Sequence, residues 1–422
     1  MFTDFDRSAM ARALALAERG LETTDPNPRV GCVISQGEEI VGEGWHERAG
    51  EPHAEVHALR AAGARAAGAT AYVTLEPCSH HGRTPPCVDA LLAARVARVI
   101  FALEDPNPRV SGKGAEALRR AGVAVESGLM AAEAADVNPG FLKRMRSGRP
   151  WVRVKLAMSL DGRTALANGA SQWITGPAAR EDVQHWRARS SAILTGIGTV
   201  LADDPRLDVR LPDLPDGLPR PQPLRVILDA RLQTPPSSRM LTTGGAVVIM
   251  TAENNGDNEA ELDGRRAQLM ERGAAIEKVS IAESDAPIGG GARSGAGAAA
   301  GTGAAGGTGA AADAGARPVM AAATIHLSLP DVMDRLGKRE INEVWVEAGP
   351  RLAGALVRQG LVDELIIYMA PKLLGPRARP LVEIGDLRNL QDTLNFVVVD
   401  TRQIGEDVRL RLRPQHQSPQ QR

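Results

Sequence analysis

The sequence predicts an α/β protein made of two consecutive layered domains. Short apolar segments typical of strands alternate with helix-length segments along both halves of the chain. The length of 422 residues is two to three times the roughly 150 residues of a common domain. The turn-forming stretch Gly148-Arg149-Pro150 separates the two halves. We therefore predict a first domain over residues 1–148, a second over 149–414, and a disordered tail at 415–422.

The first half alternates strands and helices at the spacing of one layered domain. Its predicted strands are Arg29–Ser35, Ile40–Trp45, Ala71–Glu76, Val96–Leu103 and Val123–Glu126. Its predicted helices are Ser8–Arg19, Pro52–Ala66, Pro86–Ala94, Ala115–Ala121 and Ala131–Arg146. Strands separated by helices of this length pack as a sheet that helices cover.

The second half repeats this alternation from Trp151 onward. Its predicted strands are Trp151–Met158, Ala192–Thr195, Arg225–Asp229, Ala246–Thr251, Thr324–Leu327, Glu343–Glu347, Glu364–Ala370, Phe396–Asp400 and Val408–Leu412. The last of these alternates charged and apolar residues, which is typical of an antiparallel strand with one solvated face.

One segment of the second half differs from the rest of the chain. Residues 289–316 contain 11 Gly and 12 Ala, so they have almost no side chain to bury. We predict a flexible insert over 285–317, because such a segment cannot offset the entropy lost on ordering. Gly301, Gly303 and Gly306 match the dinucleotide pattern G-x-G-x-x-G, but the match lies in biased composition without a flanking strand and helix, and we reject it.

Composition excludes several classes of protein. The net charge is −1, and aromatic residues make up 3% of the chain, which argues against a long nucleic acid as partner. Three cysteines cannot form a disulfide framework and fit a reducing compartment. The amino end lacks the basic region of a signal peptide, and no apolar run reaches the ~18 residues of a membrane span. We expect a cytoplasmic protein that binds neither nucleic acid nor membrane.

A cluster of metal-binding residue types lies in the first half. Five of the eight histidines fall between positions 46 and 81, and Cys78 and Cys87 lie within or just beyond this stretch. Zinc prefers imidazole and thiolate ligands, and a catalytic zinc site keeps three protein ligands and an open position. His53, Cys78 and Cys87 supply this set, and each is expected where a strand ends or a helix begins, so that helix dipoles favour the thiolates.

Other assignments of these residues remain open. His57 lies four residues after His53 and is an alternative ligand, although a packing role suits it better. His80 and His81 are expected to face substrate or solvent, and Cys32 lies in an apolar strand and is expected to be inert. A structural zinc module without catalysis is an alternative for the whole site, and it would need a fourth protein ligand.

Glu55 is the candidate catalytic residue. The pattern H-x-E followed by P-C is the signature of zinc deaminases, in which the glutamate is a proton carrier and not a ligand. Zinc brings the pKa of bound water near ~7, so hydroxide can attack a ring carbon that carries an amino group. Glu55 would take the proton from water and return it to the departing ammonia. The spacing departs from the signature, because eight residues separate Cys78 from Cys87.

Three segments carry a resemblance to a known family. DPNPRVGCVI (25–34), GWHERAGEPHAE (44–55) and TLEPCSHHGRTPPC (74–87) together resemble the bifunctional deaminase/reductase of riboflavin biosynthesis. The long insert between the two cysteines is this family's variant of the deaminase site. The resemblance covers nearly the whole chain and implies a cytidine-deaminase-like three-layer α/β/α domain, followed by a dihydrofolate-reductase-like α/β domain. A deaminase that edits nucleic acid is the alternative that composition opposes.

The second half carries the reductase motifs of the same family. SLDGRT (159–164), SQWITG (171–176), GIGTVLADDP (196–205), LDVR (207–210) and EAGPRL (347–352) appear in this order. The resemblance implies that NADPH contacts Ala157, Trp173, Thr199, Asp203, Gly349, Pro350, Arg351, Leu352, Ala353, Gly354 and Ala355. It implies that substrate contacts Ser171, Arg187, Leu207, Arg210 and Glu347. Lys155 and Asp161 lie close by in the pattern, which does not show whether either of them donates a proton.

The implied pathway step defines the ligands. The first domain would deaminate a phosphorylated diamino-phosphoribosylamino-pyrimidinone, and the second would transfer a hydride from NADPH to the opened ribosyl group. Both domains must hold the same phosphate, for which Arg83, Arg109 and Lys113 are candidates in the first domain. The expected cofactors are therefore Zn²⁺ and NADPH, and the enzyme is expected to form a homo-oligomer.

Overall fold

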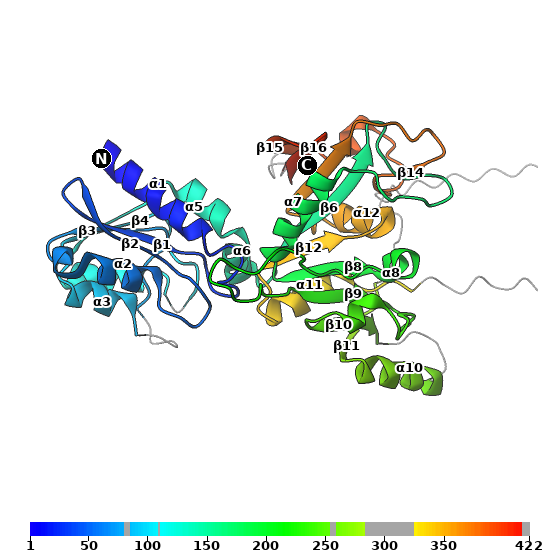
Figure 1. Ribbon diagram of the computed structural model, residues 1–422, viewed down its shortest axis with the longest axis horizontal. Coiled ribbons are helices and arrows are strands. Elements are labelled where there is room, and N and C mark those ends of the chain that lie inside the picture. The colour runs from blue at the N-terminus through cyan, green and yellow to red at the C-terminus, as the bar shows by residue number, and fades with distance from the viewer. Residues whose placement is uncertain (80–84, 109, 254–258, 283–324, 416–422) are drawn as a thin grey trace, which may run out of the picture.

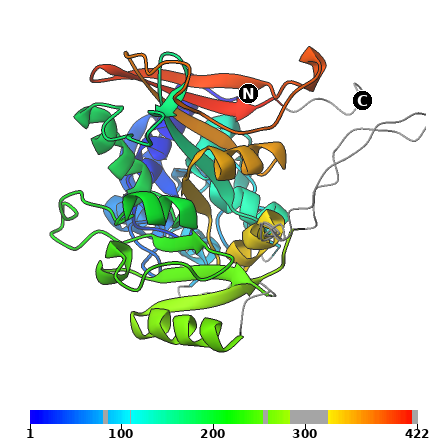
Figure 2. The ribbon, with the colours of Figure 1, turned by 90° about the vertical axis from the view of Figure 1, so that its right-hand side faces the viewer.

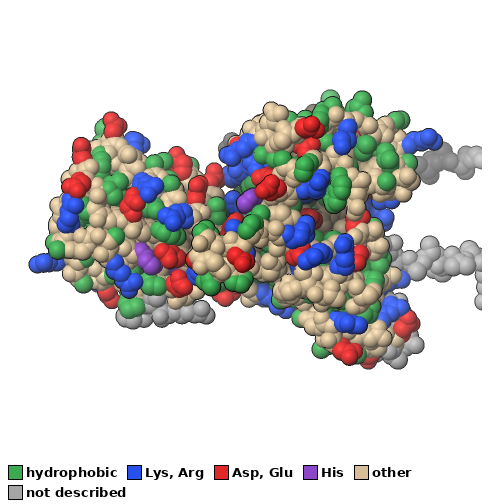
Figure 3. All heavy atoms as spheres, in the orientation of Figure 1, with side chains coloured by type: hydrophobic (Ala, Val, Ile, Leu, Met, Phe, Trp, Pro, Cys, Tyr) green, Lys and Arg blue, Asp and Glu red, His purple; other side chains and the backbone are tan. Residues whose placement is uncertain are grey.

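A computed structural model describes residues 1–79, 85–108, 110–253, 259–282 and 325–415. Two lobes lie side by side along the long axis, and helix α6 (Pro139–Ser147) lies between them (Figure 1). The space-filling view shows a narrower region where the lobes meet, and basic and acidic side chains are interspersed over the visible face (Figure 3). None of the described helices is long and apolar enough to cross a bilayer.

The first lobe has a five-stranded mixed sheet in the order β2-β1-β3-β4-β5. The strands are β1 (Gly31–Gln36), β2 (Glu39–Trp45), β3 (Thr70–Val73), β4 (Arg98–Phe101) and β5 (Ala124–Ser127). The helices are α1 (Asp4–Glu18), α2 (Ala54–Ala62), α3 (Cys87–Ala93), α4 (Lys113–Arg120) and α5 (Ala131–Val137), with a 3-10 turn at Gly63–Ala66. β1 is antiparallel to β2 and β3, and β3, β4 and β5 are parallel.

Alternating strand residues of this sheet bury against helices on both faces. Cys32 and Ile34 of β1 pack with α2, α3 and α4, whereas Val33 between them packs with α1 and α5. This alternation follows from the two-residue period of a strand. The predicted three-layer α/β/α arrangement is therefore confirmed.

The second lobe has a nine-stranded sheet in the order β11-β10-β9-β8-β12-β6-β13-β16-β15. Its strands are β6 (Trp151–Ser159), β8 (Ala192–Gly196), β9 (Leu224–Leu228), β10 (Val247–Ala252), β11 (Ala274–Val279), β12 (Glu343–Glu347), β13 (Glu364–Ala370), β15 (Phe396–Ile404) and β16 (Asp407–Pro414). β16 runs antiparallel to both of its neighbours, β13 and β15, and the other paired strands of this sheet are parallel. Figure 2 shows β15 and β16 at one end of the sheet and β10, β11 and their helix at the other. β7 (Arg163–Ala165) and β14 (Arg379–Pro380) form a separate small sheet.

Helices again cover both faces of this sheet. The helices are α7 (Pro177–Ala188), α8 (Ile197–Asp203), α9 (Arg239–Thr242), α10 (Glu259–Glu271), α11 (Leu329–Lys338) and α12 (Pro350–Arg358), with a 3-10 turn at Leu390–Asp392. α11 and α12 pack on one face, and α7, α8, α9 and α10 pack on the other. The sequence prediction of an α/β fold in both halves is confirmed.

Several element boundaries differ from the prediction for local reasons. The predicted helix Ala131–Arg146 is two helices, because Pro139 cannot donate an i→i−4 hydrogen bond and starts a new helix. α1 begins at Asp4 and not at Ser8, since the Thr3 and Asp6 side chains form a reciprocal cap. In place of the strand predicted over Thr324–Leu327, the described residues show only an isolated bridge between Leu327 and Ile281.

Two further predictions need a correction or lie outside the described residues. The strand predicted to run to Glu76 ends at Val73, so Cys78 follows an irregular segment and not the end of a strand. The predicted insert at 285–317 lies outside the described residues, as does most of the predicted tail.

Candidate active sites

Three side chains of the first lobe converge at the amino ends of two helices. His53 is the residue before α2 and has extended backbone angles, and Cys87 is the first residue of α3. His53 Nδ1 lies 3.1 Å from Cys87 Sγ and 3.6 Å from Cys78 Sγ. These three possible ligand atoms all lie within 4.8 Å of one another. One imidazole nitrogen and two sulfurs in so small a space fit the donor set of zinc.

The electrostatics of this cluster favour thiolate at one sulfur before any metal binds. Hydrogen bonding by Cys87 and His53 lowers the pKa of Cys78 to about 4. The backbone N–H of Cys87 also donates to Cys78 Sγ at 3.4 Å. The hydrogen bond with Cys78 and burial raise the pKa of Cys87, so this thiol keeps its proton until a cation displaces it.

Glu55 lies in the first turn of α2 beside this cluster and is 3% exposed. Burial raises its pKa, which suits a carboxyl group that must both accept and release a proton. Residues two apart on a regular helix diverge. His53 and Glu55 share one site because His53 lies before the helix, in extended conformation.

A cavity of about 530 Å³ opens in front of Glu55 and the zinc-ligand candidates. Its walls come from several segments of the first lobe, from α6, and from Glu340 of the second lobe. The lining residues include Asn27, His46, His53, Glu55, Glu76, Cys78, Asp105, Asn107, Phe141, Arg144 and Glu340. This volume suits a small molecule of the size of a substituted nucleotide.

The polar residues of the cavity wall were not predicted from the sequence as site residues. His46 Nδ1 donates to the Pro52 carbonyl at 3.1 Å, and its Nε2 accepts from Asn27 Nδ2 at 3.1 Å. Burial lowers the pKa of His46, so the ring is neutral, and it packs edge-to-face on His53 with centroids 5.3 Å apart. The Gly-Trp-His and Asp-Pro-Asn runs were visible as motifs, but their mutual contact was not.

Glu76 and Asp105 line the same cavity as Cys78. Glu76 is 4% exposed and accepts backbone N–H bonds from Asp105, Gly112 and Ala115. Burial raises the pKa of Asp105 to about 6. Since Glu76 is separated from Cys78 by one proline, its three bonds fix the segment that carries this cysteine.

The remaining candidates of the first lobe divide into two groups. His57 is not part of the three-residue cluster, and its Nε2 is buried without a hydrogen-bond partner. Cys32 is fully buried in β1, where burial raises its pKa. Lys113 is the first residue of α4 and donates to the Pro108 carbonyl. His80, His81, Arg83 and Arg109 lie outside the described residues.

In the second lobe, three neighbouring parallel strands end at one edge of the sheet. β8, β12 and β6 lie side by side, with Glu347 of β12 opposite Lys155 of β6. Ala157 follows on β6, and the helices α8 and α12 begin directly after β8 and β12 at Gly196 and Gly349. A Cβ atom at Gly198 or Gly349 would meet open space. This edge is where α/β sheets bind nucleotide ligands, with helix amino ends near the phosphates.

Two of the predicted substrate residues bond each other. Arg187 donates from Nε and Nη2 to the Glu347 carboxylate at 2.6 and 2.8 Å, and from Nη1 to the Asp208 carbonyl. Although burial opposes it, Arg187 lowers the pKa of Glu347 to about 2. Lys155 faces this pair, and burial lowers its pKa. Hydrogen bonds from Ser159 and from the Leu374 and Gly375 N–H groups lower the pKa of Asp161 to about 2, so Asp161 is an ionised turn residue.

The other predicted residues of the second lobe lie on three further segments. Trp173 is 65% exposed beneath the Arg180 guanidinium, and Ser171 lies two residues before it in the same loop. Thr199 lies in α8, and Asp203 ends this helix. Leu207 is buried, whereas Arg210 is half exposed and bonds Asp208.

The predicted NADPH turn Gly349–Ala355 begins helix α12. Gly349 caps the helix, and Pro350 and Arg351 form its first turn. Leu352 lies against Gly196, while Ala353 and Gly354 are buried. At Gly354 a Cβ atom would lie 2.0 Å from the Glu383 carbonyl oxygen, so α12 packs closely on the segment around Glu383.

Comparison with known proteins agrees with both lobes. A model of the cytidine and deoxycytidylate deaminase zinc-binding region matches residues 3–103, and a model of the RibD C-terminal domain matches 150–283 and 307–410. Riboflavin biosynthesis protein RibD of Escherichia coli is 47% identical over 96% of this chain and 99% of that protein. RibD of Haemophilus influenzae is 43% identical, with 98% of each chain covered.

Solved structures extend the agreement to the arrangement of the whole chain. The structure of Acinetobacter baumannii RibD superposes with a TM-score of 0.79 at 42% identity, covering 98% of this chain and 99% of that one. A Thermotoga maritima diaminohydroxyphosphoribosylaminopyrimidine deaminase/5-amino-6-(5-phosphoribosylamino)uracil reductase superposes with a TM-score of 0.75 at 28% identity, covering 97% and 99%.

Fold and site together define a zinc-type deaminase joined to an α/β reductase in one polypeptide. The chain belongs to the RibD family of bifunctional deaminase/reductases of riboflavin biosynthesis. The resemblance stated from the sequence motifs is thereby confirmed.

Proposed function

We propose that the first domain, residues 1–148, removes an amino group from a diamino-phosphoribosylamino-pyrimidinone. The second domain, residues 149–414, then reduces the ribosyl group of the product to a ribityl chain with NADPH. The observation that carries the first step is the convergence of His53, Cys78 and Cys87 beside buried Glu55, in a cavity of about 530 Å³.

His53, Cys78 and Cys87 are the residues that would hold zinc, which when bound makes hydroxide available near neutral pH. Glu55 would accept the proton of the attacking water at its carboxylate and deliver a proton to the departing amine. The product of this hydrolysis is a carbonyl group on the ring and ammonia. Three ligand atoms of the described residues converge here beside a buried carboxyl group and an open cavity, and this arrangement supports a catalytic site.

In the second domain, the chain supplies the pocket for a hydride transfer whose chemistry belongs to NADPH. The amino ends of α8 and α12, with Ala157, Trp173, Thr199 and Asp203 nearby, would hold the cofactor. Arg187 orients Glu347 toward the substrate side of the sheet edge. Ser171, Leu207 and Arg210 complete the proposed substrate contacts, and Lys155 is the proposed proton donor.

We also propose a homo-oligomer in the cytoplasm. The exposed valines of edge strand β15, Val397, Val398 and Val399, support association of two copies. The three cysteines are free, and two of them are needed as thiolates, which fits a reducing compartment. Sedimentation velocity of the purified protein measures the oligomeric state.

The replacement Glu55→Gln tests the proposed function. We expect ammonia release to fall by at least 10²-fold, since general acid–base catalysis contributes about 10²–10⁴-fold. NADPH oxidation with pre-deaminated substrate should remain unchanged. Glu38→Gln, at an exposed turn between β1 and β2, is the matched control. Loss of both activities in Glu55→Gln, or retention of ammonia release, would contradict the assignment.

A further inference from the structure

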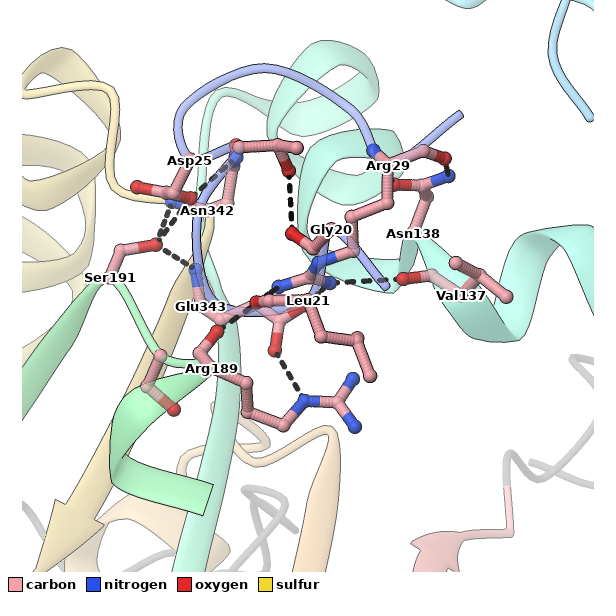
Figure 4. A network of polar contacts seen from close by, with 12 residues as sticks. Gly20, Leu21, Asp25, Arg29, Val137, Asn138, Arg189, Ser191, Asn342 and Glu343 are labelled. Carbon is pink, nitrogen blue, oxygen red and sulfur yellow. Dashed lines mark hydrogen bonds and ion pairs between the residues drawn. The ribbon is translucent and has the colours of Figure 1, made fainter. Parts of the chain in front are cut away.

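A loop of the first domain is held by residues of the second. Asp25 Oδ1 accepts hydrogen bonds from Ser191 Oγ and Asn342 Nδ2, both at 2.9 Å (Figure 4). Asn342 Nδ2 also donates to the Pro26 carbonyl at 2.9 Å. Ser191 directly precedes β8 and Asn342 directly precedes β12, so both donors come from the central strands of the reductase sheet.

Arg29 anchors the other end of this loop. Its side chain is 7% exposed and donates from Nη1 to Glu343 Oε1 at 2.5 Å and to the Val137 carbonyl at 2.9 Å. Nη2 donates to the Arg189 carbonyl at 3.0 Å (Figure 4). Glu343 is 1% exposed and also bonds Arg153. Separating Arg29 from Glu343 would leave a buried charge without its partner, which is strongly unfavourable. The contact therefore holds this end of the loop firmly on the second domain.

The segment between the two anchors forms part of the deaminase cavity. Asn27 lies between Asp25 and Arg29 and bonds His46, whose ring packs on the zinc-ligand candidate His53. Pro26, Pro28 and Val30 line the same cavity. This segment belongs to the first domain and lines the deaminase cavity, but contacts with the second domain fix its position.

The second domain also reaches this wall from the side of α6. Arg144 donates from Nε to Asn342 Oδ1 at 2.6 Å and from Nη2 to the Pro26 carbonyl at 3.3 Å. Arg144 and Glu340 both line the cavity. The Asn342 side chain therefore connects α6 and the loop at one point next to the substrate space.

We propose that Arg29 is a positioning residue for deamination, and that docking of its guanidinium on Glu343 sets the place of Asn27 and His46 in the deaminase site. This inference rests on the proposed location of that site. Arg29 touches neither the cavity nor the candidate ligands, and it acts through the loop that it anchors. Ser191 of the reductase domain holds the start of the same loop through Asp25, so it too affects the reaction in the deaminase domain.

The test uses full-length, zinc-loaded protein with the variants Arg29→Met, Arg29→Lys and Ser191→Ala. Kinetics of ammonia release are measured with the diamino-pyrimidinone substrate, and NADPH oxidation is measured with pre-deaminated substrate. Arg12→Met is the matched control, since Arg12 is half exposed on α1 and pairs with Glu43 of the same domain. Zinc content is determined for each variant by metal analysis.

We expect Arg29→Met to raise the KM of deamination at least tenfold, with kcat changed less than threefold and with zinc content and reductase kinetics unchanged. Arg29→Lys keeps the charge but cannot reach both Glu343 and the Arg189 carbonyl, so its KM should be intermediate. Ser191→Ala should raise the deaminase KM several-fold, although Ser191 belongs to the second domain. Arg12→Met should remain within twofold of the wild type.

Two results would overturn the proposal. One is a deaminase KM within twofold of the wild type in Ser191→Ala and in whichever Arg29 variants fold. The other is a parallel fall of both activities, which indicates a merely structural role. If Arg29→Met does not fold, Arg29→Lys and Ser191→Ala still decide the question. A failure of the deaminase assignment itself would appear separately, as ammonia release that persists in Glu55→Gln.

Discussion

Replacing Glu76 by Gln should weaken the first domain and its hold on zinc, although Glu76 is not a ligand candidate. Glu76 Oε2 accepts from the Gly112 N–H at 2.9 Å and the Asp105 N–H at 3.3 Å, and Oε1 accepts from the Ala115 N–H at 3.1 Å. These donors lie at the amino end of α4 and in the loop before it. A carboxylate at this place also benefits from the helix dipole.

The expected loss of unfolding free energy in Glu76→Gln follows from what happens to each of these three hydrogen bonds. The amide oxygen can replace Oε2 and keep two acceptor bonds, but these lose the charge and roughly half of their strength. The amide NH₂ then faces the Ala115 N–H, which leaves a buried donor unpaired at a cost of about 1–3 kcal/mol. The weakened acceptor bonds and the unpaired donor together lower the unfolding free energy by about 3 kcal/mol. For a domain of this size, that lowers the melting temperature by roughly 6–12 °C.

Differential scanning calorimetry with saturating zinc measures this change in the transition of the first domain. Because Glu76 positions the Pro77-Cys78 segment, we also expect zinc affinity to fall about tenfold or more in chelator competition. Glu104→Gln is the matched control, since Glu104 is exposed in the same loop. A melting temperature and zinc affinity equal to those of Glu104→Gln would refute the reasoning.

Three further perturbations separate local effects in the two domains. Burial raises the pKa of Asp6, but hydrogen bonds from Thr3, Arg98 and Tyr72 outweigh it and lower this pKa to about 2. The ionised carboxylate therefore stabilises the fold by up to about 2 kcal/mol above pH 4, and this contribution is lost as the pH falls toward 2. Asp6→Asn should therefore lower the melting temperature at pH 7, with a smaller difference at pH 3; an equal difference at both pH values would contradict this. Gly354→Ala places a Cβ atom 2.0 Å from a carbonyl oxygen, so we expect a raised KM for NADPH and unchanged ammonia release, and an unchanged KM would show that α12 does not hold the cofactor. Removing zinc with a chelator should stop ammonia release but spare NADPH oxidation with pre-deaminated substrate, and readdition of zinc should restore it; a chelated enzyme that still releases ammonia would argue against the metal site.

The sequence predicted those parts of the site whose chemistry is local. His53, Cys78, Cys87 and Glu55 belong to short motifs, and each motif carries its own helix start, so their convergence could be expected before the fold was known. The α/β class followed in the same way from the alternation of apolar segments. Helix ends were less predictable where a proline, as at Pro139, divides a continuous pattern into two helices.

The parts that sequence reasoning missed depend on contacts between distant segments. Glu76 was assigned to the end of a strand, and its role depends on backbone N–H groups 29 to 39 residues further along the chain. Arg187 and Glu347 were each expected to contact the substrate, but the bond between them, across 160 residues, was not predicted. The side-chain type indicates what a group can bind, whereas only the fold determines which partner is present.

The contact between the domains gives a physical reason for joining two activities in one chain. Strand β12 carries Glu343 at its first residue and Glu347 at its last, and four steps of a strand span about 13 Å. Glu343 bonds the loop of the deaminase cavity through Arg29, and Glu347 bonds Arg187 at the reductase edge. β12 is paired with β8 and β6 along its length, so its position is fixed on both sides. A displacement of the deaminase loop is therefore resisted by the same strand that presents Glu347 to the reductase site, and separate polypeptides would have to form this buried ion network anew at each encounter.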